Sequence, residues 1–184
     1  MIGRFAVVVA LLLPCMVMAQ TAKTLTFDTP AGKVTNSATS FGKTPQKIAS
    51  ITAKETAAIE SLAEHGKAFV KAYLPQVISP TLSDYDRAFA MWRSEASPRF
   101  TSQQVISTLG VVLGEKMRED MPLEWVVVKD ELGTDYALRA VNFELLTFPF
   151  SSVSKRVDEY HGDFIAEVYF AVRDRLLTGG IKKR

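Results

Sequence analysis

Carboxylate side chains are the residues of this sequence best suited to acid–base chemistry. They gather at two places, residues 115–120 and residues 130–135. Two carboxylates at a suitable separation can hydrolyse a glycosidic bond, one as the acid and the other as the nucleophile or base. Charged side chains at helix ends and turns are more often simply solvated. We therefore keep a polymer hydrolase that uses Glu115 and a second carboxylate as one hypothesis.

The sequence contains no complete motif for a metal site, a cysteine nucleophile or a serine nucleophile. The two histidines, His65 and His161, stand in no metal-ligand spacing, and Cys15 is the one cysteine. The sequence contains no Gly-x-Ser-x-Gly elbow and no glycine-rich loop for a phosphate. We therefore expect no metal site and no cofactor.

A polar and basic segment near the C-terminal end suits an anion. Ser152, Lys155 and Arg156 lie at the expected start of a helix. Because the first amides of a helix are free donors at the positive end of its dipole, these side chains would complete a site for a carboxylate on a peptide, glycan or protein. In the alternative interpretation, Ser152 caps the helix and the basic side chains form surface ion pairs with Asp158 or Glu159.

Trp125 allows two interpretations. Within a run of β-forming residues it fits the core of a sheet, as Trp92 fits the apolar face of a helix. If exposed, Trp125 would anchor a sugar ring or a protein partner. The candidate residues for binding a ligand or partner are Ser152, Lys155, Arg156, Trp125 and Glu115.

Hydrophobic spacing predicts helices in the first part of the chain. Capping-box patterns begin at Thr52 and Thr101, where a threonine hydroxyl and a side chain three residues later can exchange hydrogen bonds with the backbone. Gly110 and Gly114 leave a shallow notch that is typical of close helix packing. Helices are predicted over residues 52–74, 82–96 and 101–117.

The hydrophobic period then changes from 3.6 to 2 residues. Alternating segments predict two or three antiparallel strands over residues 123–129, 134–141 and 143–148. Two further helices are expected, one capped by Ser151 or Ser152 and one capped by Asp163. The predicted fold class is therefore α+β, with N-terminal helices, an antiparallel meander, and C-terminal helices packed on one face of the sheet.

The N-terminus has the pattern of a secretory signal. An arginine precedes an apolar run, and small residues mark a cleavage site after Ala19. The apolar run is interrupted by Pro14 and is shorter than the roughly 20 residues of a membrane span. We expect a periplasmic or secreted protein with no membrane span after cleavage, and retention of the segment as an anchor is the alternative.

Composition and length favour one ordinary domain. The chain has 184 residues, 47% of them hydrophobic, and a formal net charge of +2, which argues against a nucleic-acid binder. Cleavage would remove Cys15, so the mature chain would rely on a packed core instead of disulfides. The expected organisation is a signal peptide at 1–19, an extended or flexible segment at 20–50, a single domain at 51–178 and a basic tail at 179–184.

Four motifs in a distinctive order resemble a bacterial domain-of-unknown-function family. They are LGVVLGE at residues 109–115, EWVVV at 124–128, GTDYAL at 133–138 and FPFSSVSKR at 148–156. The resemblance spans residues 101–177 and implies a small α+β module of the kind found in exported proteins. The family has no assigned reaction, so the resemblance transfers no catalytic residue. The residues that match its pattern are Gly110, Gly114, Glu115, Trp125, Gly133, Pro149, Lys155 and Arg156.

The absence of a complete catalytic constellation favours a non-catalytic, exported binding or accessory module. Its partner would be a periplasmic protein or an anionic component of the envelope, bound through the region of Lys155 and Arg156. A more specific form of this hypothesis is an immunity protein that neutralises a periplasmic toxin. The alternative is a hydrolase of envelope polymers that uses Glu115 and a second carboxylate.

Overall fold

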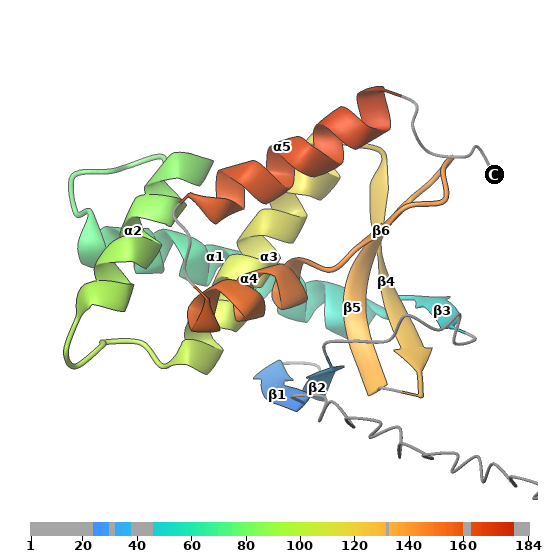
Figure 1. Cartoon of the computed structure of the whole chain (residues 1–184), viewed down its shortest axis with the longest axis horizontal. Helices are drawn as coiled ribbons and strands as arrows, with labels where there is room; N and C mark the ends of the chain where they lie inside the picture. The colour runs from blue at the N-terminus through green and yellow to red at the C-terminus, as the bar shows by residue number, and fades with distance from the viewer. Residues whose placement is uncertain (1–23, 30–31, 38–45, 132, 160–162, 179–184) are drawn as a thin grey trace, which may run out of the picture.

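The chain forms three strands, then three helices, then three more strands and two final helices among the residues that the structure describes. The computed structural model describes residues 24–29, 32–37, 46–131, 133–159 and 163–178 (Figure 1). The expected leader with its cleavage site at Ala19, the candidate ligand His161 and the tail at 179–184 lie outside these residues. The elements are β1 (Thr24–Thr29), β2 (Gly32–Ser37), β3 (Lys47–Ser50), α1 (Ala53–Tyr73), α2 (Leu82–Ser94), α3 (Ser102–Asp120), β4 (Leu123–Asp130), β5 (Gly133–Ala140), β6 (Leu146–Thr147), α4 (Pro149–Asp158) and α5 (Phe164–Leu177).

The main sheet is antiparallel and has the strand order β3-β4-β5-β6. β4 and β5 pair along their whole length, with Trp125 opposite Leu138, and Gly133 at the turn has a φ of 139° that favours glycine. This confirms the predicted meander and the α+β class. Within the segment expected to be extended or flexible, 20–50, the edge strand β3 pairs with residues 126–129 of β4. The same segment contains the separate β1–β2 hairpin, whose pairing was not predicted.

Three of the helices begin with a capping box. The boxes predicted at Thr52 and Thr101 are present, and Thr81 starts α2 in the same way. Each threonine accepts a hydrogen bond from the backbone three residues later, and the side chain there accepts one from the backbone of the threonine. Within the described ranges, no helix combines the length and apolarity needed to cross a membrane.

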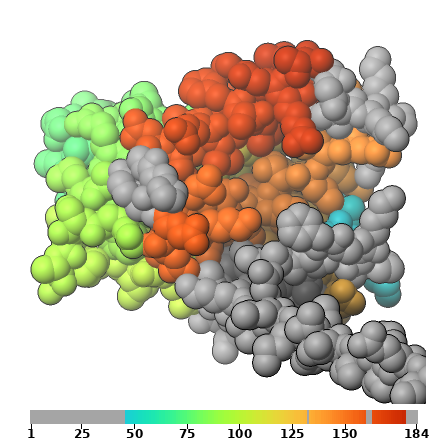
Figure 2. All heavy atoms as spheres, viewed as in Figure 1, coloured from blue at the N-terminus to red at the C-terminus, as the bar shows by residue number. Residues whose placement is uncertain are grey.

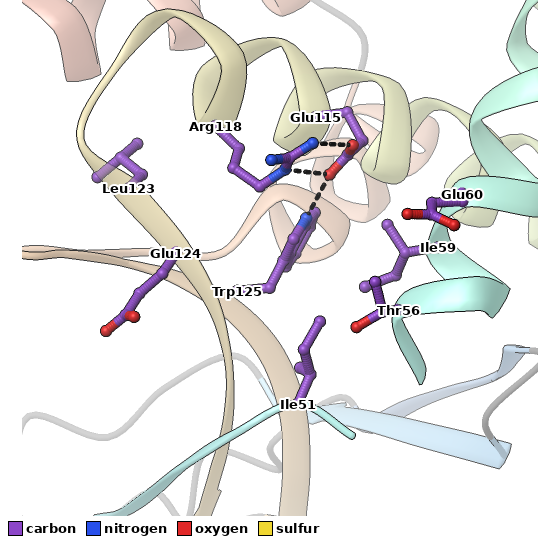
Figure 3. A pocket seen from close by; sticks show the side chains of 9 residues that line it. All are labelled: Ile51, Thr56, Ile59, Glu60, Glu115, Arg118, Leu123, Glu124 and Trp125. Carbon is purple, nitrogen blue, oxygen red and sulfur yellow. Dashed lines mark hydrogen bonds and ion pairs between the residues drawn. The ribbon is translucent and has the colours of Figure 1, made fainter. Parts of the chain in front are cut away.

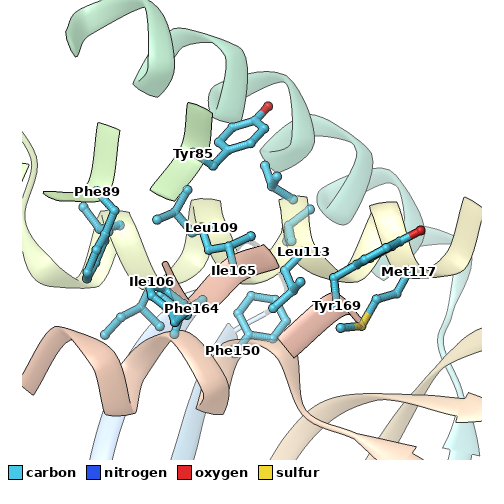
Figure 4. Close-up of a cluster of buried hydrophobic side chains, with 14 of the residues drawn as sticks. Tyr85, Phe89, Ile106, Leu109, Leu113, Met117, Phe150, Phe164, Ile165 and Tyr169 are labelled. Atoms are coloured by element: carbon cyan, nitrogen blue, oxygen red, sulfur yellow. The ribbon is translucent and has the colours of Figure 1, made fainter. Parts of the chain in front are cut away.

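Helix α3 runs through the centre of the core. All its residues from Val105 to Gly114 are buried. Figure 4 shows Leu109, Leu113 and Met117 of α3 among side chains from the surrounding helices. Gly110 lies against Phe150 of α4, where an added Cβ would come within 2.6 Å of the Phe150 ring. The predicted notch therefore serves helix packing.

Both faces of the main sheet carry buried side chains. The helices pack on the face that carries Trp125 and Leu138, as predicted. On the opposite face, Val126, Val128 and Ala137 form a second, smaller buried cluster. Strand β2 lies against β5 (Figure 1), so the N-terminal hairpin packs beside the sheet.

The N-terminus of α5 is capped by a residue from another helix. Asp163 was the predicted cap, but its side chain makes no capping hydrogen bond. Instead, the buried carboxylate of Asp86 on α2 accepts hydrogen bonds from the amides of Ile165 at 2.8 Å and Ala166 at 3.1 Å. Burial raises the pKa of Asp86 to about 6, although the two amides oppose that shift. Figure 2 shows α5 packed beside α2 on one face of the molecule.

The Asp86 cap can be tested by replacement with alanine. We expect Asp86→Ala to lower the free energy of unfolding by about 2 kcal/mol at about pH 5, because two amides at a buried helix end lose their acceptor. Urea denaturation measures this loss. The matched control is Asp163→Ala, which we expect to cost less than about 0.5 kcal/mol.

The loss should also depend on pH. The pKa of Asp86 is about 6 in the folded protein and ordinarily 3.8, so the folded state holds the proton more tightly between these values. Ionisation of Asp86 therefore lowers stability as the pH rises from about 4 to about 6, and the deficit of Asp86→Ala should shrink toward neutral pH. A larger cost for Asp163→Ala than for Asp86→Ala would contradict the assignment of the cap.

Candidate functional site

Glu115 and Trp125, two of the predicted site residues, meet at the boundary between α3 and β4. The indole nitrogen of Trp125 donates a hydrogen bond of 2.7 Å to Glu115 Oε1. Arg118, one turn later on α3, donates through Nε to Oε1 at 2.9 Å and through Nη2 to Oε2 at 2.8 Å. Figure 3 shows the carboxylate held between the guanidinium and the indole ring. Both carboxylate oxygens of Glu115 therefore have a donor within the protein.

A glycine lets the Trp125 ring approach α3 this closely. A Cβ added to Gly114 would lie 2.2 and 2.3 Å from two atoms of the Trp125 ring. The ring is 5% exposed and also packs against Phe150, with the two centroids 5.9 Å apart. Because Gly114 directly precedes Glu115, the same contact that buries the ring places its N–H beside the carboxylate. Trp125 is thus a core aromatic whose polar edge belongs to the site.

The electrostatics of Glu115 favour a permanent carboxylate. Burial by itself would raise the pKa of Glu115, but the hydrogen bonds from Arg118 and Trp125 and the charge of Arg118 lower it below the ordinary value of 4.5. A general acid needs a proton near neutral pH, and its pKa is usually raised. The environment of Glu115 has the opposite effect, so this residue is suited to holding charge and not to donating a proton.

The cluster forms one wall of a pocket of about 370 Å³. The pocket opens where β3 stops pairing with β4, at Ser50 opposite Val126, and the chain turns into α1. Figure 3 shows apolar and acidic side chains around it. The lining residues are Ile51, Thr56, Ile59, Glu60, Glu115, Arg118, Leu123, Glu124 and Trp125.

The other two acidic residues of the pocket differ in their partners. Glu124 is exposed in part and forms an ion pair with Arg139 on the neighbouring strand. Glu60, on α1, lies on the other side of the pocket in Figure 3. The hydrogen bond to Glu115 chiefly raises the pKa of Arg118, and the charge of Glu60 adds a smaller effect in the same direction. Among the described residues, Glu60 makes no hydrogen bond or ion pair. Within the described residues, the carboxylate of Glu60 is thus left without a bonded partner.

The structure separates Ser152, Lys155 and Arg156 from this cluster and from free helix amides. Helix α4 begins at Pro149 with a buried first turn, and Ser152 donates its hydroxyl to the carbonyl of Phe148 instead of capping the helix. Lys155 and Arg156 lie in the last turn of α4, and the Arg156 guanidinium lies over the Phe164 ring. Lys155 and Arg156 therefore do not lie beside the first amides of α4, where they were predicted from the sequence.

Sequence reasoning missed Arg118 and Glu60. The spacing of Glu115 and Arg118, three residues apart on a predicted helix, is a recognisable signal for an ion pair. Glu60 gave no comparable signal, because only the packing of α1 beside α3 brings it to the pocket. In the described part of the chain, His, Cys, Asp and Glu residues form no group of three or more that could hold a metal ion.

A second pocket, of about 540 Å³, lies farther along α1. Leu62, His65 and Ala68 of α1 form one side, and the first turns of α3 form the other. Its α3 side carries Gln103, and Gln104 beside it already serves the capping box of Thr101. This pocket lacks carboxylates and offers a comparison surface on the same helix.

The comparisons with known proteins agree with the α+β fold. A crystal structure from Bacteroides thetaiotaomicron is similar, with a TM-score of 0.57 and 16% sequence identity over 77% of this chain. The present chain spans about half of that protein, 52% of its length. Residues 88–169 match the model of a family described as "Domain of unknown function (DUF3806)", which confirms the resemblance inferred from the four motifs. No curated protein matches the chain.

Replacement of Gly114 by alanine tests the contact that forms the site. We expect Gly114→Ala to lower the free energy of unfolding by about 2 kcal/mol, since overpacking against the Trp125 ring costs about 3 kcal/mol and the gain in helix propensity is about 1 kcal/mol. Urea denaturation followed by Trp fluorescence measures the loss. Glu119→Ala, an exposed change on the same helix, is the control. A Gly114→Ala protein as stable as the wild type would show that the ring does not need this glycine.

The ion pair of Glu115 predicts a pH-dependent contribution to stability. Because the folded pKa lies below 4.5, the contribution is complete above about pH 4.5 and is lost as the pH falls through the lowered value. We expect Glu115→Gln to cost about 1 kcal/mol at neutral pH and almost nothing at strongly acidic pH. Chemical denaturation of both proteins over this pH range measures the difference.

Comparing these two proteins removes a competing effect. Burial raises the pKa of Asp86 and of Asp135 to about 6, so these groups change stability with the opposite sign between about pH 4 and pH 6. Both proteins share that background, and it cancels in the difference. A deficit of Glu115→Gln that grows as the pH falls would contradict the lowered pKa.

Proposed function

We propose that this protein is an exported, non-catalytic binding module that recognises its partner through the pocket beside Glu115, Arg118 and Trp125. The observation that carries the proposal is the full occupation of the Glu115 carboxylate by Arg118 and Trp125. A wall held by its own hydrogen bonds is rigid, and rigid pockets with a few fixed polar groups are typical of binding sites.

Export rests on the pattern of the N-terminal segment. The arginine, the apolar run and the small residues that end at Ala19 support secretion to the periplasm. A partner would then be a periplasmic protein or an envelope component. The pocket supports this role better than the region of Lys155 and Arg156, where the guanidinium lies over Phe164 and the first turn of α4 is buried.

The hydrolase alternative has less support from the geometry. It requires Glu115 to exchange protons beside a second carboxylate. Glu60 and Glu124 do line the same pocket, but Glu115 is held as a carboxylate and Glu124 is paired with Arg139. Glu60 alone stays available, and one available carboxylate does not make the pair that the reaction needs.

Site-specific photo-crosslinking tests the proposed function. A photoreactive amino acid replaces Thr56 at the pocket, and in a matched protein it replaces Ala68, which lines the second pocket on the same helix. In cells that carry the native gene, we expect position 56 to give an adduct of defined mass in the periplasmic fraction. We expect no such adduct from position 68. Mass spectrometry of the adduct identifies the partner.

The absence of any adduct from position 56 would contradict the proposal, and so would three further outcomes. Identical adducts from both positions would show that the pocket is not the specific binding surface. An adduct confined to the cytoplasmic fraction would show that the protein does not bind its partner after export. Release of soluble fragments from isolated envelope polymer by the wild type, but not by Glu115→Gln, would establish the hydrolase instead.

A further inference from the structure

We infer that the pocket takes a lysine or arginine side chain presented by a partner protein, with Glu60 as the acceptor for its charged end. The inference rests on the proposed binding function and names the chemistry of the partner. Three features carry it: the charge of the pocket, its apolar walls and its place beside an edge strand.

The charge of the pocket favours a cation. Three glutamates and Arg118 are the charged residues among the described residues of the lining, so the lining carries a net negative charge. Arg118 is committed to Glu115 through two hydrogen bonds, which leaves Glu60 without a bonded partner among the described residues. A cationic group placed between Glu60 and Glu115 would be attracted by both carboxylates. An anion there would meet Glu60 and Glu115 directly.

The walls fit the aliphatic part of a long basic side chain. Ile51, Ile59 and Leu123 line the pocket together with the Trp125 ring. Lysine and arginine cover apolar surface with their methylene groups and extend a charged end to polar partners. A volume of about 370 Å³ lies at the low end for ligand pockets and suits one side chain with part of its backbone.

The position of the pocket favours a polypeptide as the source of this side chain. Strand β3 is the edge of the main sheet, and Ile51 of the pocket follows it directly. Three of the four residues of β3 are exposed. Edge strands accept extended segments of partner proteins through backbone hydrogen bonds, while pockets beside them select side chains. A segment at this edge would have the pocket within reach of one side chain.

The test uses capped pentapeptides with a central lysine, arginine, norleucine or glutamate between glycines. The indole N–H resonance of Trp125 in a ¹H–¹⁵N spectrum reports the pocket, and that of Trp92, bonded to the carbonyl of Phe100, is the internal control. We expect saturable shifts of the Trp125 resonance with the lysine and arginine peptides, about fivefold weaker affinity for norleucine, and no shift with glutamate.

Glu60→Gln provides the matching protein variant. It should reduce the affinity for the lysine peptide about fivefold, to the level of norleucine, and leave norleucine binding unchanged. Glu167→Gln on α5 makes the same charge change outside the pocket and should leave every affinity unchanged. Equal binding of lysine and norleucine, an unaffected Glu60→Gln protein, or no shift with any peptide would overturn the inference.

The two proposals can fail separately. If the crosslink from position 56 forms equally well in the wild type and in Glu60→Gln, the pocket binds a partner but not through a basic side chain. If the lysine peptide binds as expected but position 56 captures nothing in cells, the recognition chemistry stands and the proposed function fails.

Discussion

The close approach of aromatic rings to α3 at Gly110 and Gly114 is the constraint on which the rest of the structure depends. Phe150 and Trp125 occupy the space that side chains would take at these two positions. One ring belongs to α4 and the other to β4, so the two glycines set how near both elements come to the central helix. Since protein interiors are densely packed, neither ring can shift without moving its element.

This packing also explains the character of the candidate site. Trp125 lies on Gly114, its N–H reaches Glu115, and Arg118 closes the carboxylate from the other side. The charged groups are therefore fixed before any partner arrives, which lowers the entropy that binding would cost. Glu60, on the other side of the pocket, has no hydrogen bond or ion pair among the described residues. Fixed charges on one wall and an available acceptor on the other support the proposed recognition role better than a role in proton transfer.

Local sequence patterns predicted most of the helices and strands, but they could not predict contacts between residues that are distant in the sequence. The threonine capping boxes, the change of period before Trp125 and the proline that begins α4 all act within a few residues, so they can be seen in the sequence. The edge strand β3 and the position of Glu60 depend on which elements pack together. Helix α4 begins three residues before Ser152, so Lys155 and Arg156 lie in its last turn and not at the helix start where the sequence placed them.

The capping of α5 by Asp86 determines which residues a truncated fragment must include to keep this helix capped. The carboxylate and the amide of Ile165 are 79 residues apart, and Asp86 lies just outside the segment, residues 88–169, that matches the family model. A fragment with those boundaries would lack the cap of its last helix and would stop inside that helix. The segment that matches the family model is therefore shorter than the segment that this cap joins, and the amides of Ile165 and Ala166 must be synthesised before Asp86 can cap them.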